Sequence, residues 1–208
     1  MNLNTDNDIK NTWNLSLSSI LAGLCISIGC IVNLMVGGGF IGAVLFTFGL
    51  ITVVHYKYAL YTGTAGFVNS GKDIINLFWI ILLNNWLGCY IAAGLATYAI
   101  PDLIDKANVI VVSHSEVNIW QAFIRALFCG FLMTTAVKFA RENKWLPLIF
   151  AVPVFILAGF YHSIADAFYI CASDLHNVAN SYVVFTNWLF IILGNFVGCN
   201  LYRLKFLD

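Results

Sequence analysis

An imidazole and a carboxylate interrupt an otherwise apolar stretch late in the chain, AGFYHSIADAFYI at residues 158–170. His162 and Asp166 are costly in hydrocarbon, so within apolar segments such residues usually face a cavity or a partner group. A buried histidine bonded to a backbone carbonyl is an alternative with about equal prior weight. Gly159 and the upstream Pro153 favour a helix that breaks beside His162. The stretch therefore predicts a polar position within a broken apolar helix.

The other residues that often do chemistry are scattered through the sequence. The four histidines show no helical ligand pairing, and no cysteine belongs to a CxxC or CxxH pattern. The cysteines read as small buried residues at Cys25, Cys30, Cys89, Cys129, Cys171 and Cys199. The sequence has no nucleotide-binding loop and no nucleophile with a base at meaningful spacing. We therefore expect no enzymatic activity, no catalytic residue, no cofactor and no metal.

The composition places these residues in a membrane protein. Of 208 residues, 61% are hydrophobic and 10% are charged, and the mean hydropathy is +0.85. These values lie far outside soluble globular usage. The formal net charge is zero and the basic residues form no run, which argues against a nucleic-acid partner. We predict an integral membrane protein whose surroundings are the lipid bilayer.

Six segments have about the length that a bilayer requires. They are Trp13–Val36, Gly39–Tyr61, Asn76–Ile100, Ile119–Lys138, Trp145–Ile170 and Tyr182–Tyr202. Segments on one side of the membrane then hold Lys10, Lys72, Lys138, Arg141, Lys144, Arg203 and Lys205, whereas the opposite loops hold only Lys106. The positive-inside rule predicts that both termini are cytoplasmic. Residues 1–208 are expected to form one all-α transmembrane domain, with residues 101–118 as its one long outer loop.

An internal repeat relates the two halves of the chain. NWLGC at residues 85–89 recurs as NFVGC at residues 195–199, and Ala22 and Cys25 match Ala126 and Cys129. Because three spans separate the copies, the halves, approximately 13–100 and 119–203, must have opposite orientations. Chance similarity between apolar helices is the alternative. The repeat predicts two inverted three-helix units.

The repeat also predicts where a second helix breaks. If the fifth span breaks near His162, the second should break within KYALYTGTAG at residues 57–66. Thr62, Gly63, Thr64 and Gly66 are poor helix formers. An ordinary helix end is the alternative. A loop here would place a threonine opposite His162.

Four stretches resemble the formate/nitrite transporter family, which includes hydrosulfide channels. They are GFYHSIADAFYI at residues 159–170, LYTG at 60–63, NNWLGCY at 84–90 and LGNFVG at 193–198, in order along nearly the whole chain. The resemblance implies a homopentamer of six-helix, aquaporin-like protomers with broken second and fifth helices. Each protomer would have its own pore.

The resemblance also implies roles for individual residues. His162 matches the central pore histidine, and Thr62 matches the threonine of the loop that interrupts the second helix. The apolar rings that constrict the pore would be formed by Phe46, Leu50, Leu60 and Phe155. Asn195 matches the asparagine of the last helix. Hydrophobic constrictions of this kind reject hydrated ions.

Several vestibule positions depart from the family pattern. Asn118 stands where a lysine is usual, Thr134 where an asparagine is expected, and Asp166 where asparagine is frequent. Lys57 could restore the positive charge that attracts anions. We alternatively hypothesise that Lys57 pairs with Asp166, since a pair offsets much of the cost of two isolated charges.

The resemblance implies a channel for a small monovalent solute, such as the anion formate, nitrite or hydrosulfide, with a proton helping it across the apolar gates. His162 is the candidate proton donor or hydrogen-bond partner. The alternative is a channel for ammonium or another small neutral or cationic solute, because Asn118 replaces the lysine and Glu116 and Asp166 add carboxylates. The expected location is the bacterial inner membrane.

Overall fold

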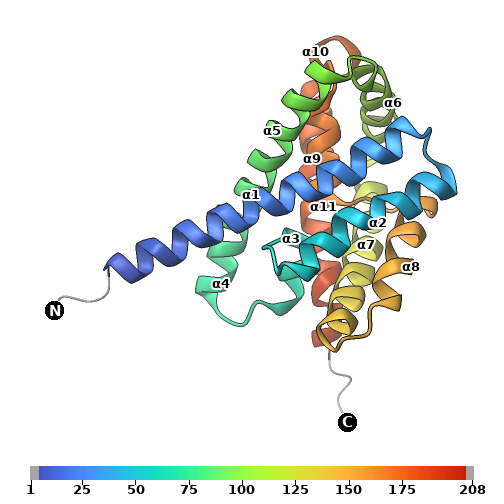
Figure 1. The fold of residues 1–208 in the computed structure, drawn as a ribbon. Helices are drawn as coiled ribbons and strands as arrows, with labels where there is room; N and C mark the ends of the chain where they lie inside the picture. Colours follow the sequence, from blue (N-terminus) through green and yellow to red (C-terminus); the bar gives the residue numbers. More distant parts are fainter. Residues whose placement is uncertain (1–4, 205–208) are drawn as a thin grey trace.

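The computed structural model describes residues 5–204, with side chains from residue 11 onward, and its regular elements there are all helical (Figure 1). The helices are α1 (Thr5–Met35), α2 (Gly39–His55), α3 (Tyr61–Thr64), α4 (Gly71–Asn76), α5 (Leu83–Ala99), α6 (Leu103–Ser115), α7 (Ile119–Arg141), α8 (Leu146–Leu157), α9 (Ser163–Ala172), α10 (Leu175–Val178) and α11 (Ser181–Asn200). A π-helical stretch, Leu77–Leu82, joins α4 to α5, and 3-10 turns occupy Ala65–Phe67 and Leu201–Arg203. The two termini, which we predict to be cytoplasmic, lie outside the described residues.

Four helices in the described part of the chain are long and apolar enough to cross a membrane. They are Asn11–Met35, Gly71–Ala99, Ile119–Arg141 and Ser181–Arg203. The other two predicted spans are interrupted, because α2 ends at His55 and α8 ends at Leu157, and shorter helices follow. The protein is therefore an integral membrane protein with two broken apolar segments. The predicted outer loop, residues 101–118, differs from expectation in containing the helix α6.

The two interrupted helices end with the same backbone motif. At the end of α8, Gly159 has φ of 68°, and the N–H of Phe160 donates to the carbonyl of Phe155 at 2.9 Å. At the end of α2, Lys57 has φ of 58°, and the N–H of Tyr58 donates to the carbonyl of Val53 at 2.9 Å. This left-handed cap usually takes glycine, as it does at Gly159. Lys57 is thus an L-residue held in a strained conformation.

The long helices pack in two pairs, α1 with α5 and α7 with α11. Glycines allow the backbones to touch, as small residues commonly do between membrane helices. A Cβ on Gly88 would lie 2.2 Å from the carbonyl oxygen of Ile20, and a Cβ on Gly198 would lie 2.0 Å from that of Leu127. Any larger residue at Gly88 or Gly198 would therefore push the pair apart. Figure 1 shows these helices around the short segments α3 and α9.

Candidate functional site

His162 and Thr62 meet where the two broken helices approach each other. His162 is the N-cap of α9, and its Nδ1 accepts a hydrogen bond from the Ala165 N–H at 3.2 Å. Its Nε2 lies 2.8 Å from the Thr62 hydroxyl, and both side chains are buried. Because Nδ1 acts as an acceptor, a neutral imidazole carries its proton on Nε2 and donates it to Thr62. The Thr62 hydroxyl hydrogen then remains available to a solute.

Two aromatic rings pack beside this pair. The Phe155 ring stacks on the His162 ring with centroids 5.7 Å apart, and Phe46 meets Phe155 edge to face at 5.9 Å. Leu50 and Leu60 are also buried, each 1% exposed. The structure thus brings Phe46 and Phe155 to the His162–Thr62 pair, whereas Leu50 and Leu60 line a cavity together with Gly63 and Thr64.

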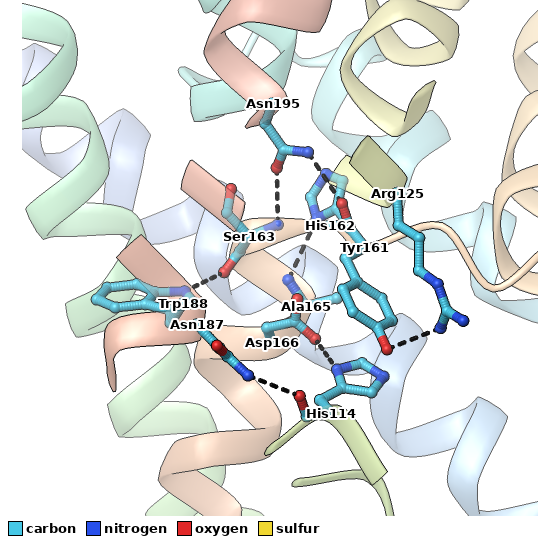
Figure 2. Close-up of polar contacts among 10 residues, drawn as sticks. All are labelled: His114, Arg125, Tyr161, His162, Ser163, Ala165, Asp166, Asn187, Trp188 and Asn195. Carbon is cyan, nitrogen blue, oxygen red and sulfur yellow. Dashed lines mark hydrogen bonds and ion pairs between the residues drawn. The ribbon is translucent and has the colours of Figure 1, made fainter. Parts of the chain in front are cut away.

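Two asparagines hold the broken helices in place. Asn195 of α11 accepts from the Ser163 N–H at 2.8 Å and donates to the carbonyls of Tyr161 at 2.9 Å and Ala126 at 2.8 Å (Figure 2). Its role is therefore to fix the residues that flank His162. A buried side chain that satisfies three backbone groups is a strong local constraint.

Asn85 of α5 does the same for the other break. It accepts from the Tyr61 N–H at 2.8 Å and donates to the carbonyls of Ala59 at 2.8 Å and Ser19 at 2.7 Å. The residues that flank Leu60 are thus fixed as those that flank His162 are. Thr62 follows Leu60 on α3, so Asn85 positions it indirectly.

The contacts of the first and fourth spans align the two halves of the repeat differently from the predicted alignment. The Cys89 thiol approaches the Gly23 carbonyl at 3.7 Å, and the Cys199 thiol approaches the Gly130 carbonyl at 3.3 Å. Gly23 therefore corresponds to Gly130. Matching Ala22 to Ala126 and Cys25 to Cys129 was wrong by three residues, about one helical turn.

Asp166 pairs with His114, and the hypothesis that it pairs with Lys57 is wrong. The His114 Nδ1 lies 2.9 Å from an Asp166 carboxylate oxygen. His114 comes from α6, inside the predicted outer loop, and its ring stacks on the Tyr161 ring at 4.0 Å. The Tyr161 hydroxyl in turn accepts a hydrogen bond from Arg125 at 2.9 Å (Figure 2). Asp166 therefore belongs to a polar network beside α9.

A cavity of ≈ 590 Å³ lies on the Thr62 side of the site. We call it the basic vestibule, because its lining includes His55, Lys57 and Arg141. Leu50 and Leu60 also line it. Among the described residues that line this cavity, none carries a carboxylate. Its electrostatic field should therefore favour anions.

The remaining predicted vestibule residues have packing or capping contacts. Asn118 is exposed and caps α7 by accepting from the Trp120 N–H at 2.9 Å. Thr134 is buried and donates to the Cys199 carbonyl at 3.1 Å, where α7 packs on α11. The structure brings neither residue to the basic vestibule.

Sequence reasoning missed three polar residues of this region. His114 had no spacing signal, since it is distant in sequence from Asp166. Arg125 had no spacing signal either, and its guanidinium donates a hydrogen bond to the Tyr161 hydroxyl. The function of Asn85 was signalled only by its repeat partner, Asn195.

Comparison with known proteins relates the chain to a family of transporters. A structure described as an FNT family ion channel superposes with a TM-score of 0.85 at 18% identity, covering 94% of this chain and 89% of that one. A pentameric formate channel with formate bound gives a TM-score of 0.83 at 22% identity, covering 93% and 95%. A search of curated proteins found no significant match. The profile of the formate/nitrite transporter family matches residues 4–203, so the chain belongs to that family.

Proposed function

We propose that the protein is a channel for a small monovalent weak-acid anion of the formate, nitrite and hydrosulfide class. The observation that carries this proposal is the basic vestibule, which adjoins an apolar constriction holding one buried polar pair, His162 and Thr62. Cations at a pore entrance raise the local anion concentration. No enzymatic step, cofactor or metal is part of the proposal.

The path begins at the basic vestibule and narrows at Leu50 and Leu60. A hydrated anion is rejected by such apolar walls, so the anion takes a proton from water in the vestibule and crosses them as the neutral acid. At the polar pair, the Thr62 hydroxyl hydrogen, left free by the His162 Nε2–H, donates to the solute. Phe46 and Phe155 form the second apolar ring, beyond which the proton is released to water.

The proposed architecture is two inverted three-helix halves. Its support is the matching set of contacts made by Asn85 and Asn195, each of which fixes one broken helix. Large apolar side chains such as Trp79 and Phe40 are exposed on the protomer, which suits lipid or subunit contacts. We propose a homopentamer, in line with the pentameric formate channel that the chain resembles. We place it in the bacterial inner membrane with both termini in the cytoplasm.

Ammonium is the second candidate solute, and the contacts of Asp166 weaken it. The alternative rested on two additional carboxylates and on Asn118. Asp166 is engaged by His114, and Glu116 lies in a separate, open cavity on α6. Neither lines the basic vestibule.

Stopped-flow light scattering of proteoliposomes distinguishes the two solutes and needs no added cosubstrate. Vesicles that contain the protein should swell in inward gradients of sodium formate faster than protein-free vesicles. If the protein accelerates swelling in ammonium chloride but not in sodium formate, the result would support the alternative. Equal rates with and without the protein in all salts would contradict a channel function.

A further inference from the structure

We propose that the basic vestibule is also a binding site for a phosphate-type dianion, which is too large and too charged to pass and therefore blocks the pore. The blocking role rests on the proposed function, whereas the binding itself does not. The occupant is defined by chemistry, as a tetrahedral oxyanion carrying two negative charges.

Two cationic side chains at this cavity have unused hydrogen-bond donors in the described part of the chain. Within the part of the chain that the structure describes, neither the Lys57 ammonium nor the Arg141 guanidinium makes a hydrogen bond or an ion pair with another residue. The neighbouring acid, Glu142, is engaged by Lys144 at 3.0 Å. The donors of Lys57 and Arg141 are thus free for a ligand.

Local structure fixes the Arg141 guanidinium and the backbone of Lys57. The Arg141 guanidinium lies over the Phe67 ring, with its carbon 3.7 Å from the ring centroid. Lys57 occupies the left-handed cap of α2, where the corresponding residue after α8 is Gly159. A strained backbone at the wall of a cavity points to a function for the residue that bears it. Retaining lysine in place of glycine preserves a charge at this wall.

The size of the cavity indicates an occupant larger than the conducted solute. A volume of ≈ 590 Å³ falls in the range of small-molecule sites, about 300–1,000 Å³. The buried Leu50 and Leu60 line it, so a doubly charged ion that enters meets apolar side chains. Such an ion remains in the vestibule and excludes the monovalent solute.

The charges favour a dianion over a monoanion. The attraction of a fixed cation for a ligand doubles with the ligand charge, and arginine binds phosphate oxygens through two parallel hydrogen bonds. Formate, with one charge, would be held weakly enough to leave. Phosphate would be held by the Arg141 fork and the Lys57 ammonium together.

Isothermal titration calorimetry of the purified, detergent-solubilised protein with inorganic phosphate tests the site without any flux. We expect saturable binding that Arg141→Gln weakens about tenfold or more, the usual effect of losing a charged hydrogen bond. Lys144→Gln is the matched control, since Lys144 pairs with Glu142 and does not line the cavity, and it should bind as wild type does. No binding, or equal weakening by both variants, would overturn the proposal.

Two further arms identify the source of the ligand and separate this proposal from the channel function. Methyl phosphate that binds more tightly than inorganic phosphate would indicate an organic phosphate ester, and the reverse would indicate the free ion. In proteoliposomes, phosphate should slow formate entry from the vestibule side only. If the protein conducts formate but does not bind phosphate, the phosphate site is contradicted and the channel function stands. If it binds phosphate but conducts nothing, the phosphate site stands, and the channel function and the block of the pore are contradicted.

Discussion

Replacing Lys57 with glycine is expected to stabilise the protein and, at the same time, to slow anion flux. The stability gain follows from the left-handed backbone at this position, where φ is 58°. An L-residue in this conformation costs about 1–2 kcal/mol, and glycine removes that cost. Glycine also has a larger conformational entropy in the unfolded chain, which offsets roughly half of the gain in stability. The net effect is about 0.5–1 kcal/mol, or roughly 1–4 °C in melting temperature for a chain of this length.

The loss of flux follows from the size of the basic vestibule. A sphere of ≈ 590 Å³ has a radius of about 5 Å, so a wall charge acts on a central anion over about that distance. The attraction is about 0.8 kcal/mol at the dielectric constant of water and about 1.7 kcal/mol at half that value. Removing it should lower anion occupancy, and flux below saturation, by about 4- to 18-fold at low salt.

Differential scanning fluorimetry and stopped-flow formate uptake measure the two effects on the same preparation. Lys57→Arg is the matched control, since it keeps both the charge and the strained backbone and should retain flux and melting temperature. A Lys57→Gly protein that transports formate at the wild-type rate would refute the electrostatic reasoning. One that melts at a lower temperature would refute the assignment of strain.

Three other changes test the pore and its supports. His162→Phe should abolish formate uptake while gel filtration still shows the assembled oligomer, because the loss is confined to the donor to Thr62 and the cap of α9; normal uptake would remove His162 from the path. Asn195→Leu should lower stability by about 3 kcal/mol or more, since three buried backbone groups lose their partner, and a melting temperature like that of wild type would contradict this. His114→Leu should cost about 3 kcal/mol by leaving Asp166 unpaired, and adding Asp166→Leu should recover most of it, as measured by denaturant melts; no recovery would argue against the ion pair.

Features that leave a local mark could be predicted from the sequence. Gly159 and Pro153 indicate a break near His162, and the glycine and threonines after Leu60 indicate the other break. These marks arise because glycine, proline and hydroxylated residues alter the backbone within a few positions. The contact between Thr62 and His162 then followed from assuming that the two breaks meet.

Contacts between distant segments left no such mark. The His114–Asp166 pair joins a predicted loop to α9, and no spacing rule connects them. The expected pairing of Lys57 with Asp166 assumed that both charges are buried at one depth, whereas Lys57 is exposed at an open cavity and needs no partner. The repeat register was wrong by one turn because small residues recur at that spacing in both helices. The contacts of Gly23 and Gly130, together with those of the Ser19 and Ala126 carbonyls, distinguish the two alignments.

Uptake into proteoliposomes that enclose a pH-sensitive dye tests the central claim most directly. The vesicles are mixed with sodium formate or with ammonium chloride, with no phosphate present. The account predicts that formate, which crosses with a proton, acidifies the lumen faster with the protein than without it, and that Lys57→Gly slows this acidification. A protein that instead accelerates alkalinisation in ammonium chloride, and leaves the rate in formate unchanged, would contradict an anion channel with a basic entrance.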